Sequence, residues 1–305
     1  MCATSRPLWA ICQSEYFPLN LKIRSPKTRY QYWIALECYG RHLGRQPTAD
    51  DLADDAVTLW MGHLLQRQPP LSVETVRERV NRVLALWTWL AKRTVGMRWP
   101  TVVKPPSPDP LPIALTKEQL RRFFVSALKE RGSIDGVPAD VWCASYFGFI
   151  WSTAERKGAA LATRIDWFDF ERLTVRIPPA SRKGGRKWGV YPLWPELVPL
   201  LRACIAADPS RELMWPWRKC ERSYYTMYDR ILRDASIPVD RKHKTHGLRV
   251  SHATWKAALG GDATRALMHS DPATTMRHYI DQSLMPADKV RLFVPWERTL
   301  PPGTG

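Results

Sequence analysis

Apolar residues recur at helical spacing in three stretches of the first hundred residues. The first spans residues 25–44 and is opened by a serine N-cap before a proline and closed by a glycine. A second runs from Asp54 to Leu65, and Ser72 opens a third, longer one. These patterns predict a small all-helical domain over 25–99. Residues 1–24 have no strong period and are interpreted as a loose lead-in.

Proline dominates the stretch that follows. Residues 100–112 hold six prolines in thirteen positions, which removes backbone donors and favours an extended, semi-rigid linker. Helical spacing resumes at Thr116, where the sequence has the pattern of a capping box. We therefore place the domain boundary in this linker and expect a second domain over 113–282, followed by a tail over 283–305.

The second domain mixes two periods. Val141–Trp151 is a strongly apolar helix, whereas Leu173–Ile177 and Trp188–Leu193 are short β-prone runs separated by the basic, glycine-containing segment SRKGGRK. That arrangement predicts a β-hairpin with a flexible tip. Further helices are predicted at 195–206, at 221–235 and from about residue 248. The predicted fold is mainly α with a small antiparallel β-sheet, an α+β architecture.

Charge adds a candidate partner. The chain of 305 residues has 46 Lys and Arg against 29 Asp and Glu, a net charge of +17. Residues 1–109 carry 15 basic and 9 acidic residues, which leaves 31 and 20 for the remainder. Two basic domains favour a polyanion held between them, although a solvated basic surface would have the same composition.

Cysteine spacing and hydropathy bear on other classes of protein. The six cysteines are far apart and form no CxxC pair, so we expect free thiols in a reducing cytosol and neither a metal site nor a cofactor. No apolar run is long enough to span a bilayer, and the N-terminus lacks the pattern of a secretory signal.

The candidate chemistry is concentrated between residues 246 and 279. This stretch holds His246, Arg249, His269 and Tyr279. An arginine can clamp a phosphate, a histidine can move a proton, and a tyrosine can attack phosphorus. Each of these residues alone has a structural explanation, so the chemical interpretation depends on further partners elsewhere in the chain.

The whole order of features resembles the tyrosine recombinases, also called the phage-integrase family. STAERKGAALATRIDWFDFE is similar to that family's first-arginine segment, SRKGGRKWGVYPL to its lysine hairpin, and HGLR, MHSD and TTMRHY to its remaining motifs. The resemblance implies a helical core-binding (SAM-like) domain, a linker and a mixed catalytic domain. It assigns the catalytic set to Arg156, Lys183, His246, Arg249, His269 and Tyr279.

The implied reaction is metal-free DNA strand cleavage. The two arginines would clamp the phosphate oxygens, and His246 would help Tyr279 lose its proton. Lys183 would protonate the leaving 5′-oxygen, and His269 would hydrogen-bond the phosphate. The implied product is a 3′-phosphotyrosine link that a 5′-hydroxyl can reseal, and the resemblance therefore implies a site-specific recombinase of the integrase type.

Several positions depart from the family pattern. Ala159 stands where an acidic residue is usual, and Glu155 or Asp166 could substitute for it. Met268 stands where a glycine is usual, and the Arg249–His269 interval is about one helical turn short. The commonest spacing from His269 to the tyrosine would fall on the neighbour of Tyr279, His278, which has no hydroxyl.

The partner that the resemblance implies is double-stranded DNA, bound by a homotetramer whose subunits are monomers or dimers when free. The tail is a candidate for exchange between protomers, and the expected location is the cytoplasm, at the nucleoid. The alternatives are a catalytically impaired DNA-binding relative, a type IB topoisomerase and an unrelated basic helical protein. The candidate DNA-binding residues are Arg77, Arg82, Arg182 and Arg186.

Overall fold

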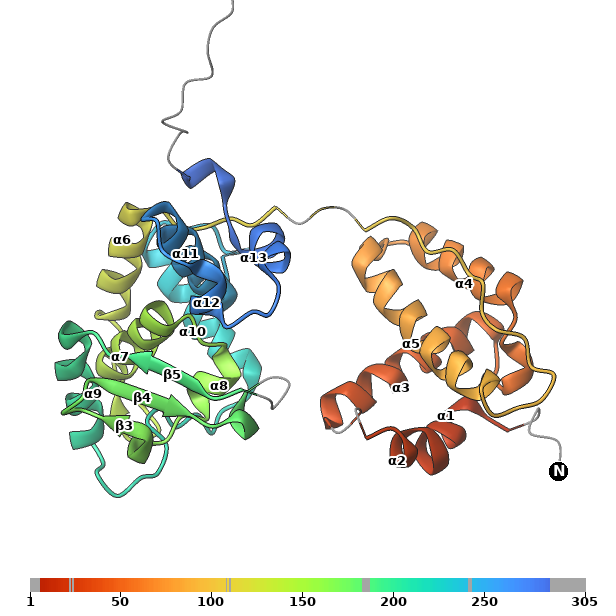
Figure 1. Cartoon of the computed structure of the whole chain (residues 1–305), viewed down its shortest axis with the longest axis horizontal. Coiled ribbons are helices and arrows are strands. Elements are labelled where there is room, and N and C mark those ends of the chain that lie inside the picture. The colour runs from red at the N-terminus through yellow and green to blue at the C-terminus, as the bar shows by residue number, and fades with distance from the viewer. Residues whose placement is uncertain are drawn as a thin grey trace, which may run out of the picture. The chain divides into compact units, whose positions relative to one another are not determined.

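The computed structural model describes residues 6–21, 23, 25–107, 109, 111–182, 187–240 and 243–285. The chain divides into two compact units, residues 1–109 and 110–305, each described below by itself (Figure 1). Lys183 and Arg186 lie outside the described residues, and so do the apolar residues of the tail beyond 285. Among the described helices, none is long and apolar enough to cross a membrane.

The first unit is a helical bundle. Helix α3 (Pro26–Leu43) begins after Ser25 and ends at Gly44, which takes the left-handed conformation at φ 71°. Helix α4 spans Asp54–Gln66, and α5 spans Val73–Ala91 with the Ser72 side chain accepting a hydrogen bond from the Thr75 amide at 3.2 Å. These three helices confirm the three predicted from apolar spacing.

The prediction that residues 1–24 form a loose lead-in was wrong: residues 8–19 are helical and pack into the bundle. Residues Leu8–Ile11 form α1, Cys12–Tyr16 a π-helical turn and Phe17–Leu19 the short α2. Leu8 and Cys12 are fully buried, and the Tyr16 hydroxyl lies 2.9 Å from that of Tyr32 on α3. The π-helical turn interrupts the 3.6-residue period, so the apolar residues of this segment show no helical spacing in the sequence.

The first part of the proline-rich segment is bonded to the first unit. The Trp87 indole donates to the carbonyl of Arg98 at 2.7 Å, and the Thr101 amide donates to the Asp54 carboxylate at 2.8 Å. Further along, the Arg77 guanidinium donates to the carbonyl of Pro105. The chain is therefore attached to the bundle at several points between residues 98 and 105, instead of leaving it at residue 100.

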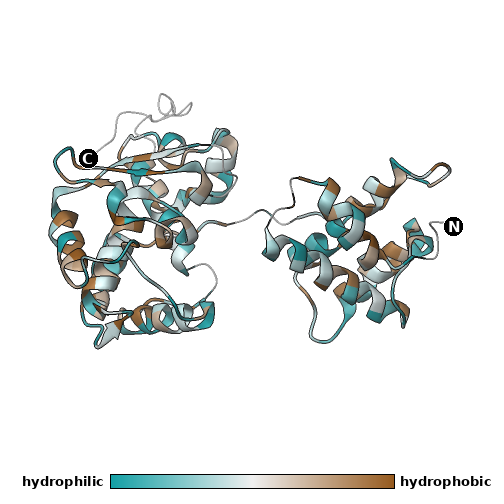
Figure 2. Cartoon of the chain, turned by 90° about the horizontal axis from the view of Figure 1, so that it is seen from below, coloured by the Kyte–Doolittle hydropathy of each residue, from teal (hydrophilic) through white to brown (hydrophobic). Residues whose placement is uncertain are grey.

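The second unit is built around α7 (Ala139–Thr153), which is apolar on nearly every side and packs against α6, α9 and α11. Helix α6 (Lys117–Ala127) opens with the predicted capping box at Thr116. Most helices in Figure 2 carry both hydrophobic and hydrophilic stretches, as expected where one face is buried. The remaining helices are α8 (Lys157–Leu161), α9 (Val198–Ala206), α10 (Glu221–Asp234), α11 (Thr245–Ala258), α12 (Ala263–Leu267) and α13 (Pro272–Tyr279).

A three-stranded antiparallel sheet lies beside these helices. Strand β4 (Thr174–Ile177) pairs with β5 (Gly189–Pro192), with Val175 opposite Tyr191, which confirms the predicted hairpin. The sequence patterns missed β3 (Phe168–Asp169), which pairs with β4, and a separate two-stranded hairpin of β1 (Ser133–Ile134) and β2 (Val137–Pro138). These strands are only two residues long, too short to show alternation. The predicted α+β fold class is confirmed.

Candidate active site

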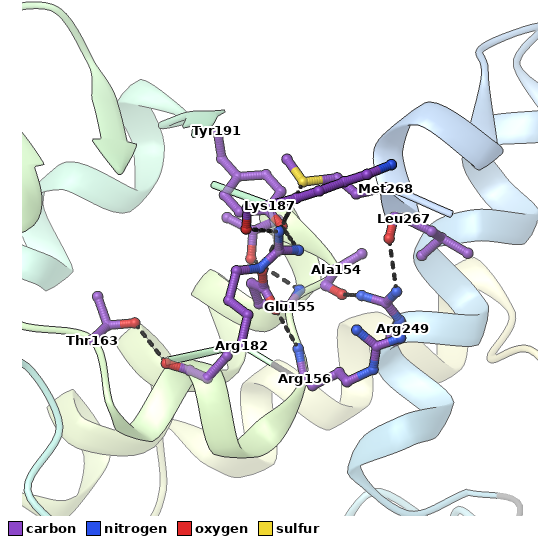
Figure 3. A network of polar contacts seen from close by, with 12 residues as sticks. Ala154, Glu155, Arg156, Thr163, Arg182, Lys187, Tyr191, Arg249, Leu267 and Met268 are labelled. Carbon is purple, nitrogen blue, oxygen red and sulfur yellow. Dashed lines mark hydrogen bonds and ion pairs between the residues drawn. The ribbon is translucent and has the colours of Figure 1, made fainter. Parts of the chain in front are cut away.

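Arg249 lies at the centre of the site. It projects from α11 and is 1% exposed. Its Nη1 donates to the carbonyl of Ala154, and its Nη2 donates to the carbonyl of Leu267 at 3.0 Å (Figure 3). Its Nε is buried and has no hydrogen-bond partner among the described residues. Because a buried guanidinium N–H without an acceptor is costly, this atom indicates a place for a ligand acceptor.

Arg156 approaches Arg249 from a second segment. Helix α7 ends at Ala154 in the left-handed conformation, and Arg156 then occupies the N-cap position of α8. Figure 3 shows the Arg156 and Arg249 side chains extending towards one another. Burial and the nearby positive charge of Arg156 lower the pKa of Arg249. Two cations this close repel one another, so an anion between them would be strongly favoured.

Tyr279 is the last residue of α13 and points inward. Its side chain is 8% exposed, and the Arg249 guanidinium carbon lies 5.4 Å from the centre of its ring. The rings of His246 and His269 meet it edge-on at centroid distances of 5.1 and 4.7 Å. His278, by contrast, is exposed to solvent. The structure therefore gathers these two histidines, Arg249 and Tyr279, and it leaves His278 outside the group.

Hydrogen bonds to Thr254 on α11 hold the end of α13 in place. The Thr254 hydroxyl donates to the carbonyl of Tyr279 at 3.1 Å and accepts from the amide of Asp281 at 3.0 Å. The Asp281 carboxylate in turn accepts from the amide of Ala114 at 2.9 Å. These bonds fix the backbone on which the tyrosine side chain depends.

His269 is held in one neutral form. Its Nε2 lies 3.2 Å from Nη2 of Arg249, which can only donate, so Nε2 accepts and carries no proton. Its Nδ1 lies 3.0 Å from the Thr275 hydroxyl and therefore carries the ring proton. Burial, followed by the charges of Arg249 and Arg156, lowers the pKa of His269 to about 4. In this state His269 offers a lone pair to the site.

Glu155, a carboxylate that interacts with Arg249 and bonds the Arg156 amide, is 1% exposed. It accepts hydrogen bonds from Nε of Arg182 and from the Tyr191 hydroxyl, each at 2.6 Å. Asp166, the other candidate substitute for an acid at position 159, is exposed and pairs with Arg164. Of the two, Glu155 alone is inside the site.

No cluster of three or more His, Cys, Asp or Glu side chains suited to a metal ion occurs among the described residues. The site is instead a set of arginines and histidines around one tyrosine, which suits the binding of a phosphate group.

Residues 114–284, more than half of the chain, match the model of the phage integrase family. The chain belongs to the phage integrase family. It is accordingly a site-specific recombinase that cleaves and rejoins DNA strands. No match was found among curated proteins.

Three solved structures share the integrase fold. The XerH site-specific recombinase bound to difH in a pre-cleavage complex is 18% identical, with 90% of this chain and 81% of that one covered and a TM-score of 0.64. The Tn1549 transposon integrase with circular intermediate DNA is 14% identical, with coverage of 90% and 95% and a TM-score of 0.63. A lambda integrase dimer bound to a COC′ core site is 12% identical, with coverage of 95% and 82% and a TM-score of 0.67.

The structure accounts for the short interval between Arg249 and His269 in this integrase. Helix α12 has only five residues, and Asp262 caps it by accepting from the Arg265 amide at 2.8 Å. Met268 then turns the chain in the left-handed conformation at φ 55° and ψ 33°. A glycine adopts this conformation without the steric cost that methionine incurs, so the site contains local backbone strain.

The predicted DNA-contacting arginines have different surroundings. The Arg182 side chain is 7% exposed, pairs with Glu155 and donates to the Tyr191 hydroxyl at 3.0 Å, so it is not a surface phosphate contact in this structure. Arg77 donates to the linker. Arg82 is half-buried, and its Nε has no partner among the described residues.

Sequence reasoning also missed two side chains of the site, Tyr191 and Thr275. Strand alternation could have found Tyr191, because β5 buries alternate residues and Gly189 shares its inward face. Thr275 had no such signal, since its role depends on the turn before α13.

Proposed function

We propose that Tyr279 is the nucleophile of this integrase and that Arg156 and Arg249 clamp the scissile phosphate. The observation that carries this proposal is the buried, unpartnered Nε of Arg249 among the described residues, close to a tyrosine ring flanked by two histidines. A phosphate oxygen is the acceptor that this donor lacks. Planar guanidinium groups suit that role, because they stay charged and can bind two oxygens at once.

In this mechanism the Tyr279 oxygen attacks phosphorus and the bond to the 5′-oxygen breaks. The tyrosine proton passes to His246, which is exposed and lies against the tyrosine ring. Lys183, assigned through the resemblance of its hairpin, donates a proton to the leaving oxygen. Resealing reverses these transfers, so the protons balance over one cycle.

His269 has a conditional role. Its Nε2 accepts from Arg249 while the site holds no phosphate, and its pKa of about 4 keeps it neutral near pH 7. Donation to a phosphate requires a proton on Nε2. A bound phosphate anion would raise the pKa of His269 and would draw Arg249 away from Nε2, so both changes favour the donor form.

The oligomeric state on DNA depends on contacts between copies of the chain. We propose a homotetramer on DNA, formed from free monomers or dimers in the cytoplasm at the nucleoid, with residues 283–305 exchanged between protomers. Arg82, whose Nη1 donates to the carbonyl of Glu78 in its own helix, and Arg186 are the proposed phosphate contacts, since Arg77 and Arg182 are bonded to other segments of the chain. Sedimentation of complexes formed with and without residues 283–305 tests the exchange, and unchanged assembly would contradict it.

A strand-exchange assay tests the function as a whole. Duplexes of two lengths, carrying a site selected by binding from random-sequence DNA, are mixed with the protein. Recombination predicts duplexes of hybrid length. Relaxation of a supercoiled plasmid without hybrids would indicate a topoisomerase, and binding without either product would indicate an impaired relative.

A further inference from the structure

Three buried side chains beside the site form a closed triangle of hydrogen bonds. Arg182 donates from Nε to Oε1 of Glu155 at 2.6 Å and from Nη2 to the Tyr191 hydroxyl at 3.0 Å. The Tyr191 hydroxyl donates to the same Glu155 oxygen at 2.6 Å. Figure 3 shows the side chains of Arg182, Glu155 and Tyr191 converging on one another. All three side chains are almost fully excluded from solvent.

The triangle contacts three segments of the chain. The second oxygen of Glu155 accepts from the amide of Arg156 at 2.9 Å, which fixes the start of α8. Nη1 of Arg182 donates to the carbonyl of Lys187 at 3.1 Å, so one guanidinium joins the two residues that flank 183–186 in sequence. The same Nη1 lies 3.2 Å from the sulfur of Met268, the residue before His269.

Gly189 packs closely against the triangle. A Cβ on Gly189 would lie 2.8 Å from a Tyr191 ring carbon and 3.3 Å from both Arg182 Nε and Glu155 Oε1. Burial, and then the charge of Glu155, raises the pKa of Tyr191, so its hydroxyl keeps its proton and remains a donor. A side chain at position 189 would force Tyr191 to shift.

The charges suit a phosphate site. Glu155 is a single anion near three guanidinium groups, those of Arg156, Arg182 and Arg249. Arg182 is neutralised by its short pair with Glu155, which leaves the other two cations for an incoming anion. A buried pair of this kind adds little net stability compared with apolar residues of the same size. Its precise connections to Arg156 and Lys187 are better explained by positioning than by stability.

We propose that Glu155, Arg182 and Tyr191 are positioning residues for strand cleavage. The hydrogen bonds fix Arg182 and Lys187 relative to the Arg156 backbone, and we infer that this supports the general-acid step of cleavage. This inference rests on the proposed function, in which Lys183 supplies the proton for that step. Glu155 thereby provides a buried carboxylate in a chain that has alanine at position 159.

The test uses two nicked suicide duplexes that differ in one atom. One has the normal 5′-oxygen at the scissile bond, and the other has a 5′-sulfur, whose thiolate leaves without needing an acid because thiols are far more acidic than alcohols. Covalent adduct formation is timed for wild type, Tyr191→Phe, Arg182→Lys and Glu155→Gln. Lys183→Ala is the reference for a lost proton donor, and Arg176→Met, an exposed arginine of the neighbouring strand, is the matched control.

We expect the three triangle variants to slow cleavage of the oxygen duplex by roughly 10- to 100-fold, within the range of general acid catalysis. The sulfur duplex should restore most of that loss, as it should for Lys183→Ala, and Arg176→Met should match wild type on both. Tyr191→Phe removes only a hydroxyl, and its thermal unfolding and DNA affinity show whether it is folded.

Two results would overturn the inference while leaving the proposed function intact. One is that Tyr191→Phe and Arg182→Lys are both folded and cleave the oxygen duplex at the wild-type rate. The other is an equal slowing on both duplexes, which would mean that the triangle acts through the fold or the phosphate clamp. Absence of any adduct with wild type would instead overturn the proposed function.

Discussion

Nη2 of Arg249 donates a hydrogen bond to Nε2 of His269 across 3.2 Å. The bond fixes the histidine as a neutral acceptor, and it makes the arginine's own position depend on the protonation state of its neighbour. A protonated His269 would place a second positive charge against Arg249 and would remove the acceptor. The integrity of this site is therefore linked to pH.

The first prediction concerns acid stability. The pKa of His269 falls to about 4 on folding, below the ordinary histidine value of 6.5, so the unfolded chain binds a proton between these values and the folded chain does not. The stability that the neutral ring contributes is complete above pH 6.5 and is lost as the pH falls towards 4. Urea unfolding at pH 7, 5.5 and 4.5 should show a smaller fall for His269→Gln than for wild type. An equal fall in both proteins would contradict this account.

The second prediction concerns Arg249 itself. Lysine keeps the charge but cannot bond Ala154, Leu267 and a phosphate oxygen together, so Arg249→Lys should slow adduct formation by roughly 100- to 1,000-fold. Affinity for the uncut duplex should change little, since many other phosphate contacts support binding. Gel-shift and adduct assays on the same duplex separate these effects. Wild-type cleavage by this variant would remove Arg249 from the clamp.

The third prediction concerns the strain at Met268. Glycine and alanine both lack the methionine side chain, but only glycine adopts a φ of 55° freely. The free energy of unfolding of Met268→Gly should therefore be about 1 kcal/mol larger than that of Met268→Ala. Thermal and urea unfolding of the two variants make the comparison, and a less stable Met268→Gly would show that the turn relaxes without cost.

The fourth prediction concerns the N-terminal segment. Leu8 is fully buried in the first unit, so Leu8→Ala should lower the free energy of unfolding by about 2–5 kcal/mol. Leu21 is 73% exposed, and Leu21→Ala serves as the matched control with little effect. Urea denaturation followed by tryptophan fluorescence reports both. Equal, small effects would mean that residues 8–19 do not contribute to the bundle.

Periodicity and caps identified the elements that have regular spacing. Helix α5 follows its Ser72 cap and α6 its Thr116 capping box, so their starts were predicted correctly. The π-helical turn at Cys12–Tyr16 has no sequence signal of this kind, which is why the lead-in was misread. Local rules describe neighbours in the chain, and they miss elements that are short or irregular.

The site, too, was predicted only in part from the sequence. Motifs and their order suggested which side chains would meet, and His246, Arg249 and Tyr279 do lie together. Arg182 looked like a surface cation because it belongs to a basic run, yet it pairs with Glu155, 27 residues earlier in the chain. A buried ion pair between distant segments depends on tertiary packing, which composition and spacing do not reveal.

Covalent trapping shows directly whether Tyr279 is the nucleophile. A nicked duplex selected by binding from random-sequence DNA is incubated with wild type, Tyr279→Phe and His278→Ala, and the adducts are separated under denaturing conditions and digested for mass spectrometry. We expect an adduct with wild type and with His278→Ala, carried by the peptide that contains Tyr279, and none with Tyr279→Phe. An adduct that persists in Tyr279→Phe, or that disappears only in His278→Ala, would contradict it.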